Sequence, residues 1–263
     1  MTTPSTIDEA SFWAAERYQV IAARLQPISE AICEAAQLRG TEEILDVACA
    51  TGNAALAAAR RGCAVTAIDL DPGMLAVAQR RAETERLPVT LHQADAQRLP
   101  FQDSSFDTVL SAYGAMFAPD ARTTARELTR VCRPGGRIVL ANWPPRGVID
   151  QVFAAIQAHR PGDADLTRAV TTWGTPEGLA NLFPTSHVVT STRHIYVYAA
   201  SYATWSDTFL HHFGPASPPP DAESTRAAEL RDTLRQAFLR HNEPDGKGAR
   251  IRHDYLEAII TPH

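Results

Sequence analysis

Short apolar runs alternate with stretches of helical periodicity from residue 43 to residue 143. The apolar runs predict strands near 43–48, 64–69, 88–92, 106–111 and 137–143. The stretches between them predict helices near 53–61, 72–85 and 120–132. Regular alternation of strand and helix is the sequence form of repeated βαβ units. This part of the chain therefore predicts an α/β fold with a doubly wound parallel sheet.

Two amphipathic helices are predicted ahead of this core. The first extends from about Glu9 to Leu25, with Trp13 and Ile21 among its apolar anchors. The second begins at Pro27, because proline is well accommodated in the first turn of a helix.

The regular alternation ends after Trp143, where prolines and glycines divide the chain into short pieces. Two later strands are predicted at about 187–199 and 255–260 from their β-branched and aromatic residues. Helices near 201–212 and 222–240 are predicted between these strands.

The domain organisation follows from where the alternation holds and where it ends. We expect one domain over residues 1–263 with its core at 41–143. Residues 1–40 are expected to close over a site on that core. Residues 144–186 and 200–250 are expected to be cap insertions that bind substrate, and the second of them is a candidate lid.

Composition and charge narrow the class of protein. Hydrophobic residues make up 44% of the chain and charged residues 21%, which is typical of a folded globular protein. The net charge of -5 argues against nucleic acid as a partner, because phosphate binding requires a field of Lys and Arg. Asp and Glu are interspersed among the arginines, as expected of solvated helix faces.

The cysteines and histidines indicate neither a disulfide scaffold nor a metal site. Cys33, Cys49, Cys63 and Cys132 are widely spaced and form no CxxC pair. The chain begins with no basic, apolar leader and contains no apolar run of about 18 residues. We therefore expect a cytoplasmic protein without a metal ion or membrane insertion. The sequence leaves open whether it forms a homodimer.

The segment ILDVACATGNAAL at 44–56 carries the most specific chemistry. An apolar strand leads there into a turn of small residues that opens a helix. Backbone N–H groups and the positive end of the helix are thereby placed beside a ligand. Asp69 ends the next strand, 23 residues after Asp46, and an acid at about this spacing binds ribose hydroxyls in nucleotide-binding α/β folds. Alternatively, Asp46 caps the following helix and Asp69 is an ordinary acid at a strand end.

Four segments in order resemble the class I S-adenosylmethionine-dependent methyltransferases. LDVACATGN resembles their first motif, which is usually an acid followed by glycines at alternate positions. AIDLDPGML at 67–75 is similar to their second strand with its ribose acid, and QADAQRLPF at 93–101 to the segment whose aspartate meets the adenine amino group. CRPGGR at 132–137 resembles the turn before the fifth strand. In pattern the chain resembles the small-molecule branch of type 11 methyltransferases, which includes the ubiquinone and menaquinone methylases.

The resemblance implies a seven-stranded, mostly parallel, Rossmann-like sheet with an antiparallel C-terminal strand and helical cap insertions. It also implies an enzyme that uses S-adenosylmethionine to methylate a small molecule on oxygen, nitrogen or carbon, in secondary or cofactor metabolism. The motifs carry a set of cofactor-binding positions over to this chain: Tyr18, Asp46, Ala48, Ala50, Gly52, Asn53, Asp69, Leu70, Met74, Asp95, Ala96 and Ser111.

Each of these positions has an implied role. Asp46 is expected to hold the methionine amino group, and Asp69 the ribose hydroxyls. Leu70 and Met74 are expected to flank the adenine. Asp95 and the Ala96 backbone are expected to read the adenine edge, Ser111 to face the methionine or the substrate, and Tyr18 to close over the cofactor.

The first motif departs from the family pattern, which usually has glycine where this chain has Ala48 and Ala50. If position 50 requires a positive φ, its Cβ costs on the order of 1 kcal/mol. The turn CRPGGR and Asp107 are expected to be structural only.

The acceptor side is less specific. Tyr113, Phe117, Trp143, Trp173, Tyr202, Trp205 and Phe213 are candidates to enclose the acceptor, although ordinary core packing explains each of them equally well. If the acceptor is a hydroxyl, His212 is the first candidate for a general base and His211 the second, because both end the predicted helix 201–212. Tyr18 and Tyr113 are further candidates, and positioning alone suffices for an activated acceptor.

Two alternatives remain open at this point. A nicotinamide-dependent oxidoreductase also uses a small-residue loop and a ribose acid, but its GxGxxG fingerprint is absent. A protein that binds S-adenosylmethionine without transferring its methyl group would have the same cofactor motifs.

Overall fold

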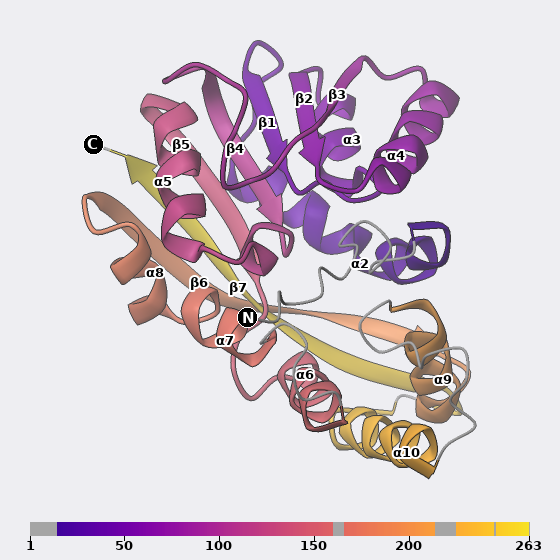
Figure 1. Ribbon diagram of the computed structural model, residues 1–263. Coiled ribbons are helices and arrows are strands. Elements are labelled where there is room, and N and C mark those ends of the chain that lie inside the picture. The colour runs from indigo at the N-terminus through magenta and orange to yellow at the C-terminus, as the bar shows by residue number, and fades with distance from the viewer. Residues whose placement is uncertain (1–14, 160–165, 214–224, 245, 263) are drawn as a thin grey trace, which may run out of the picture.

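The chain forms a seven-stranded sheet in the order β3-β2-β1-β4-β5-β7-β6. The computed structural model describes residues 15–159, 166–213, 225–244 and 246–262 (Figure 1). The strands are β1 (Glu43–Val47), β2 (Ala64–Asp69), β3 (Val89–Gln93), β4 (Phe106–Ala112), β5 (Cys132–Asn142), β6 (Ser186–Ala199) and β7 (Ala249–Pro262). The predicted α/β fold with a mostly parallel seven-stranded sheet is confirmed.

Parallel pairing joins the first five strands, and the last two are antiparallel. β1 pairs with β2 on one side and with β4 on the other, so the strand order reverses direction between β1 and β4. β7 runs antiparallel to β5, and β6 antiparallel to β7. In a doubly wound sheet, ligands bind outside the carboxyl ends of the strands at such a switch point.

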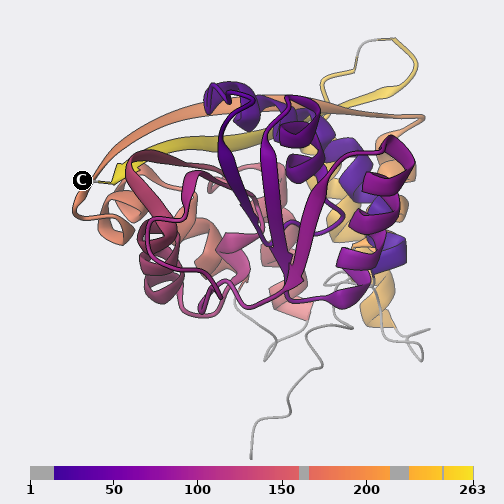
Figure 2. The same ribbon diagram turned by 90° about the horizontal axis from the view of Figure 1, so that it is seen from above.

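Helices cover both sides of the sheet (Figures 1 and 2). One side carries α2 (Ala15–Ala35), α3 (Asn53–Arg60) and α4 (Pro72–Glu85). The other carries α5 (Ala121–Val131), α7 (Leu166–Trp173) and α8 (Pro176–Leu182). A short 3-10 turn, η1 (Ala115–Phe117), follows β4. Because both faces of the sheet are covered, the central strands are buried along nearly their whole length, as in EILDV of β1, where only the first residue is exposed.

The N-terminal segment is one helix where two were predicted. α2 runs through Pro27, so the prediction that a second helix begins there was wrong. Ile28 and Ile32 lie one helical turn apart on the same face of α2, and both are buried in the core. Burial of two such side chains contributes about 3 to 6 kcal/mol, which offsets the roughly 3 kcal/mol that a proline inside a helix costs. Residues 9–14 of the predicted first helix lie outside the described residues.

The fifth and seventh strands begin earlier than predicted. β5 starts at Cys132, so the predicted turn at Pro134–Gly136 lies within the strand as an irregular stretch where pairing with β4 shifts between Phe106 and Thr108. β7 begins at Ala249, six residues ahead of the prediction, because it follows β6 along its whole length. Asp107 has the expected structural role: its carboxylate accepts hydrogen bonds from the Glu43 N–H at 2.9 Å and from Arg133 at 2.7 Å.

The cap insertions gather beyond the carboxyl end of β5. α6 (Val148–His159) follows that strand, and α9 (Tyr202–His212) and α10 (Thr225–Arg240) lie between β6 and β7. α10 packs against both α6 and α9, and Trp205 of α9 meets Phe238 of α10 edge to face with ring centres 6.3 Å apart. Residues 214–224 lie outside the described residues, and they include the first three residues of the helix predicted at 222–240.

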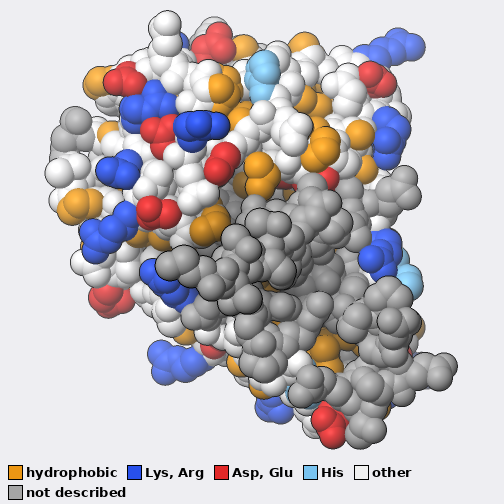
Figure 3. Space-filling model, viewed as in Figure 1, with side chains coloured by type: hydrophobic (Ala, Val, Ile, Leu, Met, Phe, Trp, Pro, Cys, Tyr) orange, Lys and Arg blue, Asp and Glu red, His pale blue; other side chains and the backbone are white. Residues whose placement is uncertain are grey.

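Side chains of both charges are interspersed over the described part of the face in Figure 3, with no continuous basic patch. This distribution agrees with the expectation that the arginines lie on solvated faces. Among the described helices, none is long and apolar enough to cross a membrane.

Candidate functional site

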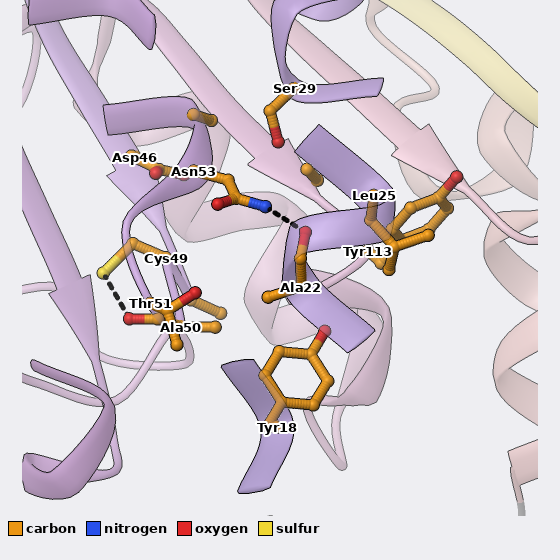
Figure 4. A pocket seen from close by; sticks show the side chains of 13 residues that line it. Tyr18, Ala22, Leu25, Ser29, Asp46, Cys49, Ala50, Thr51, Asn53 and Tyr113 are labelled. Carbon is orange, nitrogen blue, oxygen red and sulfur yellow. Dashed lines mark hydrogen bonds between the residues drawn. The ribbon is translucent and has the colours of Figure 1, made fainter. Parts of the chain in front are cut away.

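A small cavity lies at the carboxyl end of β1, between the loop at 48–52 and helix α2 (Figure 4). Its volume is about 30 Å³, which holds one or two water molecules. It is lined by Tyr18, Ala22, Leu25, Ser29, Asp46, Ala48, Cys49, Ala50, Thr51, Asn53, Ala54, Ala112 and Tyr113. The predicted positions Tyr18, Asp46, Ala48, Ala50 and Asn53 are thereby brought together at the topological switch point.

The loop at 48–52 has left-handed backbone at alternate positions. Ala48 has φ 54°, Ala50 φ 47° and Gly52 φ 83°. Position 50 thus has the positive φ that favours glycine over alanine by about 1 kcal/mol. At Gly52 a Cβ would also lie 3.0 Å from the Ala78 Cβ, so the backbone of the loop approaches α4 closely there.

A glycine across the site accommodates the alanine at position 48. An added Cβ at Gly114 would lie 2.3 Å from the carbonyl oxygen of Ala48 and 2.5 Å from its Cβ. The residue that follows β4 and Tyr113 therefore has to be glycine for the loop to keep its path. Gly114 was not singled out from the sequence, because only the fold brings it against the loop.

Asp46 is buried below the loop and caps α3. Its carboxylate accepts a hydrogen bond from the Ala55 N–H at 2.8 Å, which satisfies one of the free donors at the start of that helix. Burial, with a smaller contribution from the negative charge of Asp69, raises the pKa of Asp46 to about 7 against the opposing effect of the Ala55 hydrogen bond. A cation placed beside Asp46 would favour its ionised form. Asp46 therefore does cap the helix that follows the loop, as the alternative interpretation of this residue predicted.

Asp69 ties the loop to the end of β2. One carboxylate oxygen accepts the Ala50 N–H at 2.7 Å and the other accepts the Asp71 N–H at 2.9 Å. Burial raises the pKa of Asp69. Each carboxylate oxygen can accept a second hydrogen bond, so the group retains capacity for two ligand hydroxyls.

The positions expected around an adenine divide into an exposed and a buried set. Leu70 is 44% exposed, which is unusual for a large apolar side chain. Met74 and Ala96 are buried. Asp95 is half-buried, and its carboxylate accepts the Gln97 N–H at 2.8 Å. Leu70 is therefore the apolar surface that a planar ring can cover.

Ser111 lies at the end of β4 but outside the cavity. Its hydroxyl donates to the Val47 carbonyl at 2.8 Å and accepts the Ala115 N–H at 3.0 Å. These two hydrogen bonds link the end of β4 to the end of β1 and to the turn η1.

A network of polar side chains fastens α2 over the loop. The Asn53 amide donates to the Ala22 carbonyl at 2.8 Å. Arg81 of α4 donates to the Thr51 carbonyl at 2.6 Å, to the Asn53 side chain at 2.8 Å and to the Gln26 side chain at 3.3 Å. Tyr18 extends the cover, and its burial near Asp69 raises the pKa of its hydroxyl to about 12.

Neither histidine proposed as a base lines the cavity beside the loop. The His212 Nδ1 lies 3.0 Å from the Arg17 carbonyl of α2. His211 faces a separate hollow of about 410 Å³ whose other lining residues are Asp207, Leu210, Arg231 and Arg235. His212 therefore connects α9 to the start of α2, and His211 lies on the outer side of the cap.

Tyr113 and Trp143 form a closely stacked pair of rings at the carboxyl edge of the sheet. Their rings are stacked with centres 3.6 Å apart and planes 6° apart. Both were among the residues expected to enclose an acceptor. Trp173, by contrast, packs against Phe183 away from the loop cavity.

Sequence reasoning missed His253 of β7, which is buried beside Trp143 with ring centres 6.1 Å apart. The signal was present in the alternation of Arg250, Ile251, Arg252, His253, Asp254 and Tyr255. This pattern places the histidine on the same buried face as Ile251 and Tyr255. The predicted strand began only at residue 255 and so excluded it.

Within the described ranges, no three His, Cys, Asp or Glu side chains are grouped so that they could hold a metal ion.

Comparison with known proteins gives one matching family. The profile of the methyltransferase domain family matches residues 45–140, which carry the loop, Asp69 and Asp95. An uncharacterized protein of Mycobacterium tuberculosis is 33% identical over 85% of this chain and 86% of its own length. A demethylmenaquinone methyltransferase of Thermus thermophilus is 42% identical over 109 residues, which are 41% of this chain and 50% of that protein.

Solved structures share the fold at lower identity. A geranyl diphosphate methyltransferase superposes with a TM-score of 0.55 and 16% identity, over 90% of this chain and 78% of that one. The match covers 60% of the length of the mycobacterial relatives that are 40% identical to this chain.

Proposed function

Because this chain belongs to the class I S-adenosylmethionine-dependent methyltransferase family, we propose that it binds S-adenosylmethionine and transfers its methyl group to a small-molecule acceptor. One observation carries the proposal. The loop at 48–52 turns through three left-handed residues directly between the carboxylates of Asp46 and Asp69, and the Ala50 N–H is bonded to Asp69. This arrangement places two carboxylates beside one turn of small residues.

The residues at the switch point suit the proposed cofactor. The methionine part of the cofactor would lie against the backbone of Ala48 and Ala50, where side chains are small. Its ammonium would favour the ionised form of the Asp46 carboxylate, whose pKa is raised to about 7 mainly by burial. Asp69 would accept the two ribose hydroxyls, and Leu70 would cover one face of the adenine.

The cofactor supplies a methyl group that is already activated on a sulfonium. In the transfer, the sulfur–methyl bond breaks, its electron pair goes to sulfur, and a lone pair of the acceptor forms the new bond to carbon. A hydroxyl acceptor also releases a proton. The chain's part is to align the acceptor with the methyl and to exclude water, which supplies several kcal/mol by proximity. Tyr113 lines the loop cavity and stacks on Trp143. The two rings form an apolar surface suited to that task.

No dedicated base is assigned at the loop. His212 and His211 were proposed from the sequence, and the positions of their rings do not support direct contact with an acceptor at the cavity beside the loop. Catalysis by positioning is therefore the simpler form of the proposal.

Calorimetric titration with S-adenosylmethionine, S-adenosylhomocysteine and NAD tests the cofactor. We expect binding of the first two and none of NAD, and NAD binding alone would overturn the proposal in favour of an oxidoreductase. Mass spectrometry of small-molecule pools incubated with the protein and cofactor then tests transfer. S-adenosylmethionine binding without any S-adenosylhomocysteine production across such pools would favour a protein that uses the cofactor without methyl transfer.

Several wider expectations belong to the same proposal. We propose a cytoplasmic enzyme of secondary or cofactor metabolism in which residues 1–40 close over the cofactor. Residues 144–186 and 200–250 would form the acceptor side. A homodimer stays an open alternative that sedimentation analysis would decide.

A further inference from the structure

His253 is a buried imidazole without a hydrogen-bonding partner. It is 1% exposed, on the inner face of β7, where it pairs with Ile195 of β6. Among the described residues, neither of its ring nitrogens has a hydrogen-bond partner. Buried polar groups are nearly always satisfied, so an imidazole with two unpartnered nitrogens points to something that binds there.

Aromatic rings from three separate elements surround this imidazole. Ring centres lie 6.1 Å away at Trp143, 6.4 Å at Trp205 of α9 and 6.5 Å at Phe238 of α10. Flat side chains at these distances favour a flat ligand, because aromatic rings gain most from stacked or edge-to-face contact. We call His253, Trp143, Trp205 and Phe238 the cage. Its residues come from β7, from the residue that follows β5, and from the helices α9 and α10.

Further unpartnered polar atoms belong to Trp205, to the sequence neighbours of Trp205 and Trp143, and to Tyr113, which stacks on Trp143. Within the described part of the chain these are the Trp205 Nε1, the Ser206 Oγ, the Asn142 Nδ2 and the Tyr113 hydroxyl. All four residues are buried. Each of these groups loses its hydrogen bonds to water on burial, so a ligand that supplied partners would be stabilised by them.

The cage is connected to the cofactor loop through one pair of rings. Tyr113 lines the cavity beside Ala48 and Ala50 and stacks on Trp143 at 3.6 Å, and Trp143 is the neighbour of His253. The backbone reinforces this path, because the Tyr113 N–H donates to the Ala141 carbonyl of β5 at 2.8 Å. A ligand in the cage would thus lie on the acceptor side of the loop, beyond the Tyr113 and Trp143 rings.

We propose that His253, Trp143, Trp205 and Phe238 form the acceptor pocket of this chain, and that it takes a flat aromatic molecule bearing a hydroxyl group that hydrogen-bonds to His253. The assignment as acceptor pocket rests on the proposed methyltransferase function. Burial lowers the pKa of His253 to about 3, so its imidazole is neutral at physiological pH. A neutral imidazole offers one donor and one acceptor, which matches a hydroxyl group. Admission of the acceptor requires α9 and α10 to separate from β7.

Two probes that differ by one hydroxyl test the pocket: 1-naphthol and naphthalene. Binding of each to the full chain, saturated with S-adenosylhomocysteine, is measured by quenching of tryptophan fluorescence. We expect the native protein to prefer 1-naphthol by about tenfold, the usual worth of one buried hydrogen bond. In His253→Phe, which keeps the ring and removes both nitrogens, this preference should fall to about one.

His187→Phe is the matched control, because His187 is exposed on β6 and lies away from the cage. It should keep the native preference. His253→Gln, which retains hydrogen-bonding groups, should keep part of the preference and provides a second variant if His253→Phe fails to fold.

The pocket is overturned if neither probe binds, if the native protein shows no preference, or if His253→Phe retains the preference. Separate calorimetry with S-adenosylhomocysteine distinguishes this failure from that of the proposed function. Loss of the naphthol preference with unchanged S-adenosylhomocysteine affinity confirms the pocket. A protein that never binds S-adenosylhomocysteine but prefers 1-naphthol through His253 would retain the pocket and lose the methyltransferase proposal.

Discussion

Left-handed alanines define the cofactor loop at the scale of single residues. Ala48 and Ala50 have φ of 54° and 47°, whereas alanine normally avoids this region by about 1 to 2 kcal/mol. The surrounding contacts hold them there: Asp69 accepts the Ala50 N–H, and Gly114 leaves room for Ala48. The loop therefore keeps the path of a glycine-rich turn without two of its glycines.

The strain at position 50 gives a direct prediction. Ala50→Gly should leave the free energy of unfolding within about 0.5 kcal/mol of the native value or raise it. Relief of the left-handed Cβ offsets the added freedom of glycine in the unfolded chain. Ala76→Gly, on the exposed face of α4, is the matched control and should lose about 1 kcal/mol. Urea denaturation measures both, and equal losses would show that position 50 is unstrained.

The buried Asp46 and His253 should change the free energy of unfolding in opposite directions as the pH rises. The pKa of Asp46 is raised to about 7 in the folded protein, so the native state binds more protons than the unfolded state from about pH 4 to 7. Its contribution to stability is therefore lost as the pH rises. The pKa of His253 is lowered to about 3, so the unfolded state binds more protons from about pH 3 to 6.5, and stability rises with pH there.

Each contribution is isolated by a variant that removes the titration. Between pH 5 and 6, the stability of native protein minus that of Asp46→Asn should fall by up to about 1.4 kcal/mol. The same difference against His253→Phe should rise by up to about 1.4 kcal/mol. Urea denaturation at the two pH values measures both, and slopes of the same sign would refute the assignment.

Single residues could be placed from the sequence where their arrangement follows local spacing and not where it depends on distant contacts, and their roles toward a cofactor stay predictions. Asp46, Asp69 and the loop were located because a strand, a turn and a helix follow each other directly. Gly114 and His253 were not, because the fold alone brings Gly114 against Ala48 and His253 against Trp143. The aromatic candidates Tyr113 and Trp143 were named without any means of knowing that they stack.

At the scale of elements, helix α2 covers the loop at 48–52. Its residues Tyr18, Ala22 and Leu25 line a cavity of about 30 Å³, whereas sites for molecules of cofactor size enclose roughly 300 Å³ or more. The first half of α2 must therefore move for the proposed cofactor to enter. Pro27 lies inside this helix, where the missing N–H removes one hydrogen bond between its two halves.

Arg81 should control the rate of that movement. Arg81→Met keeps the apolar stem and removes the hydrogen bonds to Thr51, Asn53 and Gln26. We expect S-adenosylmethionine to associate several-fold faster with this variant, because opening of α2 requires those bonds to break. Stopped-flow tryptophan fluorescence measures the rate, with Arg80→Met on the exposed side of the same helix as control. Identical rates in both variants would show that α2 is not the barrier.

At the scale of the whole molecule, the order of strands was predictable and the assembly of the cap was not. Alternating strands and helices with short connections leave few ways to arrange β1 to β5. The packing of α9 on α10 depends on Trp205 and Phe209 of α9 meeting Phe238 of α10. Such contacts between distant segments leave no periodic trace in the sequence, so the cap boundaries at 144–186 and 200–250 could be proposed only from where the alternation stops.

Ligand binding at the switch point should stabilise the chain as a unit, because the proposed cofactor would contact α2 together with the ends of β1 and β2. At a concentration one hundred times the dissociation constant, such a ligand adds about 2.7 kcal/mol to the free energy of unfolding. For a chain of this size that corresponds to a rise in Tm of roughly 5 to 10 °C. Calorimetric melting should show this rise with S-adenosylmethionine and none with NAD.

Asp69→Ala locates the stabilisation in the site. The variant loses two hydrogen bonds to ribose hydroxyls, each worth about 1.5 to 3 kcal/mol, so its affinity should fall at least roughly 100-fold. At the same S-adenosylmethionine concentration the rise in Tm should then shrink to about 1 °C. Asp232→Ala, on the exposed side of α10, removes the same charge far from the loop and should keep the full rise. Because the ligand-induced change in Tm is compared, the loss of intrinsic stability that follows from the missing Ala50 and Asp71 bonds to Asp69 cancels. A full rise in Asp69→Ala would place the bound cofactor away from β2.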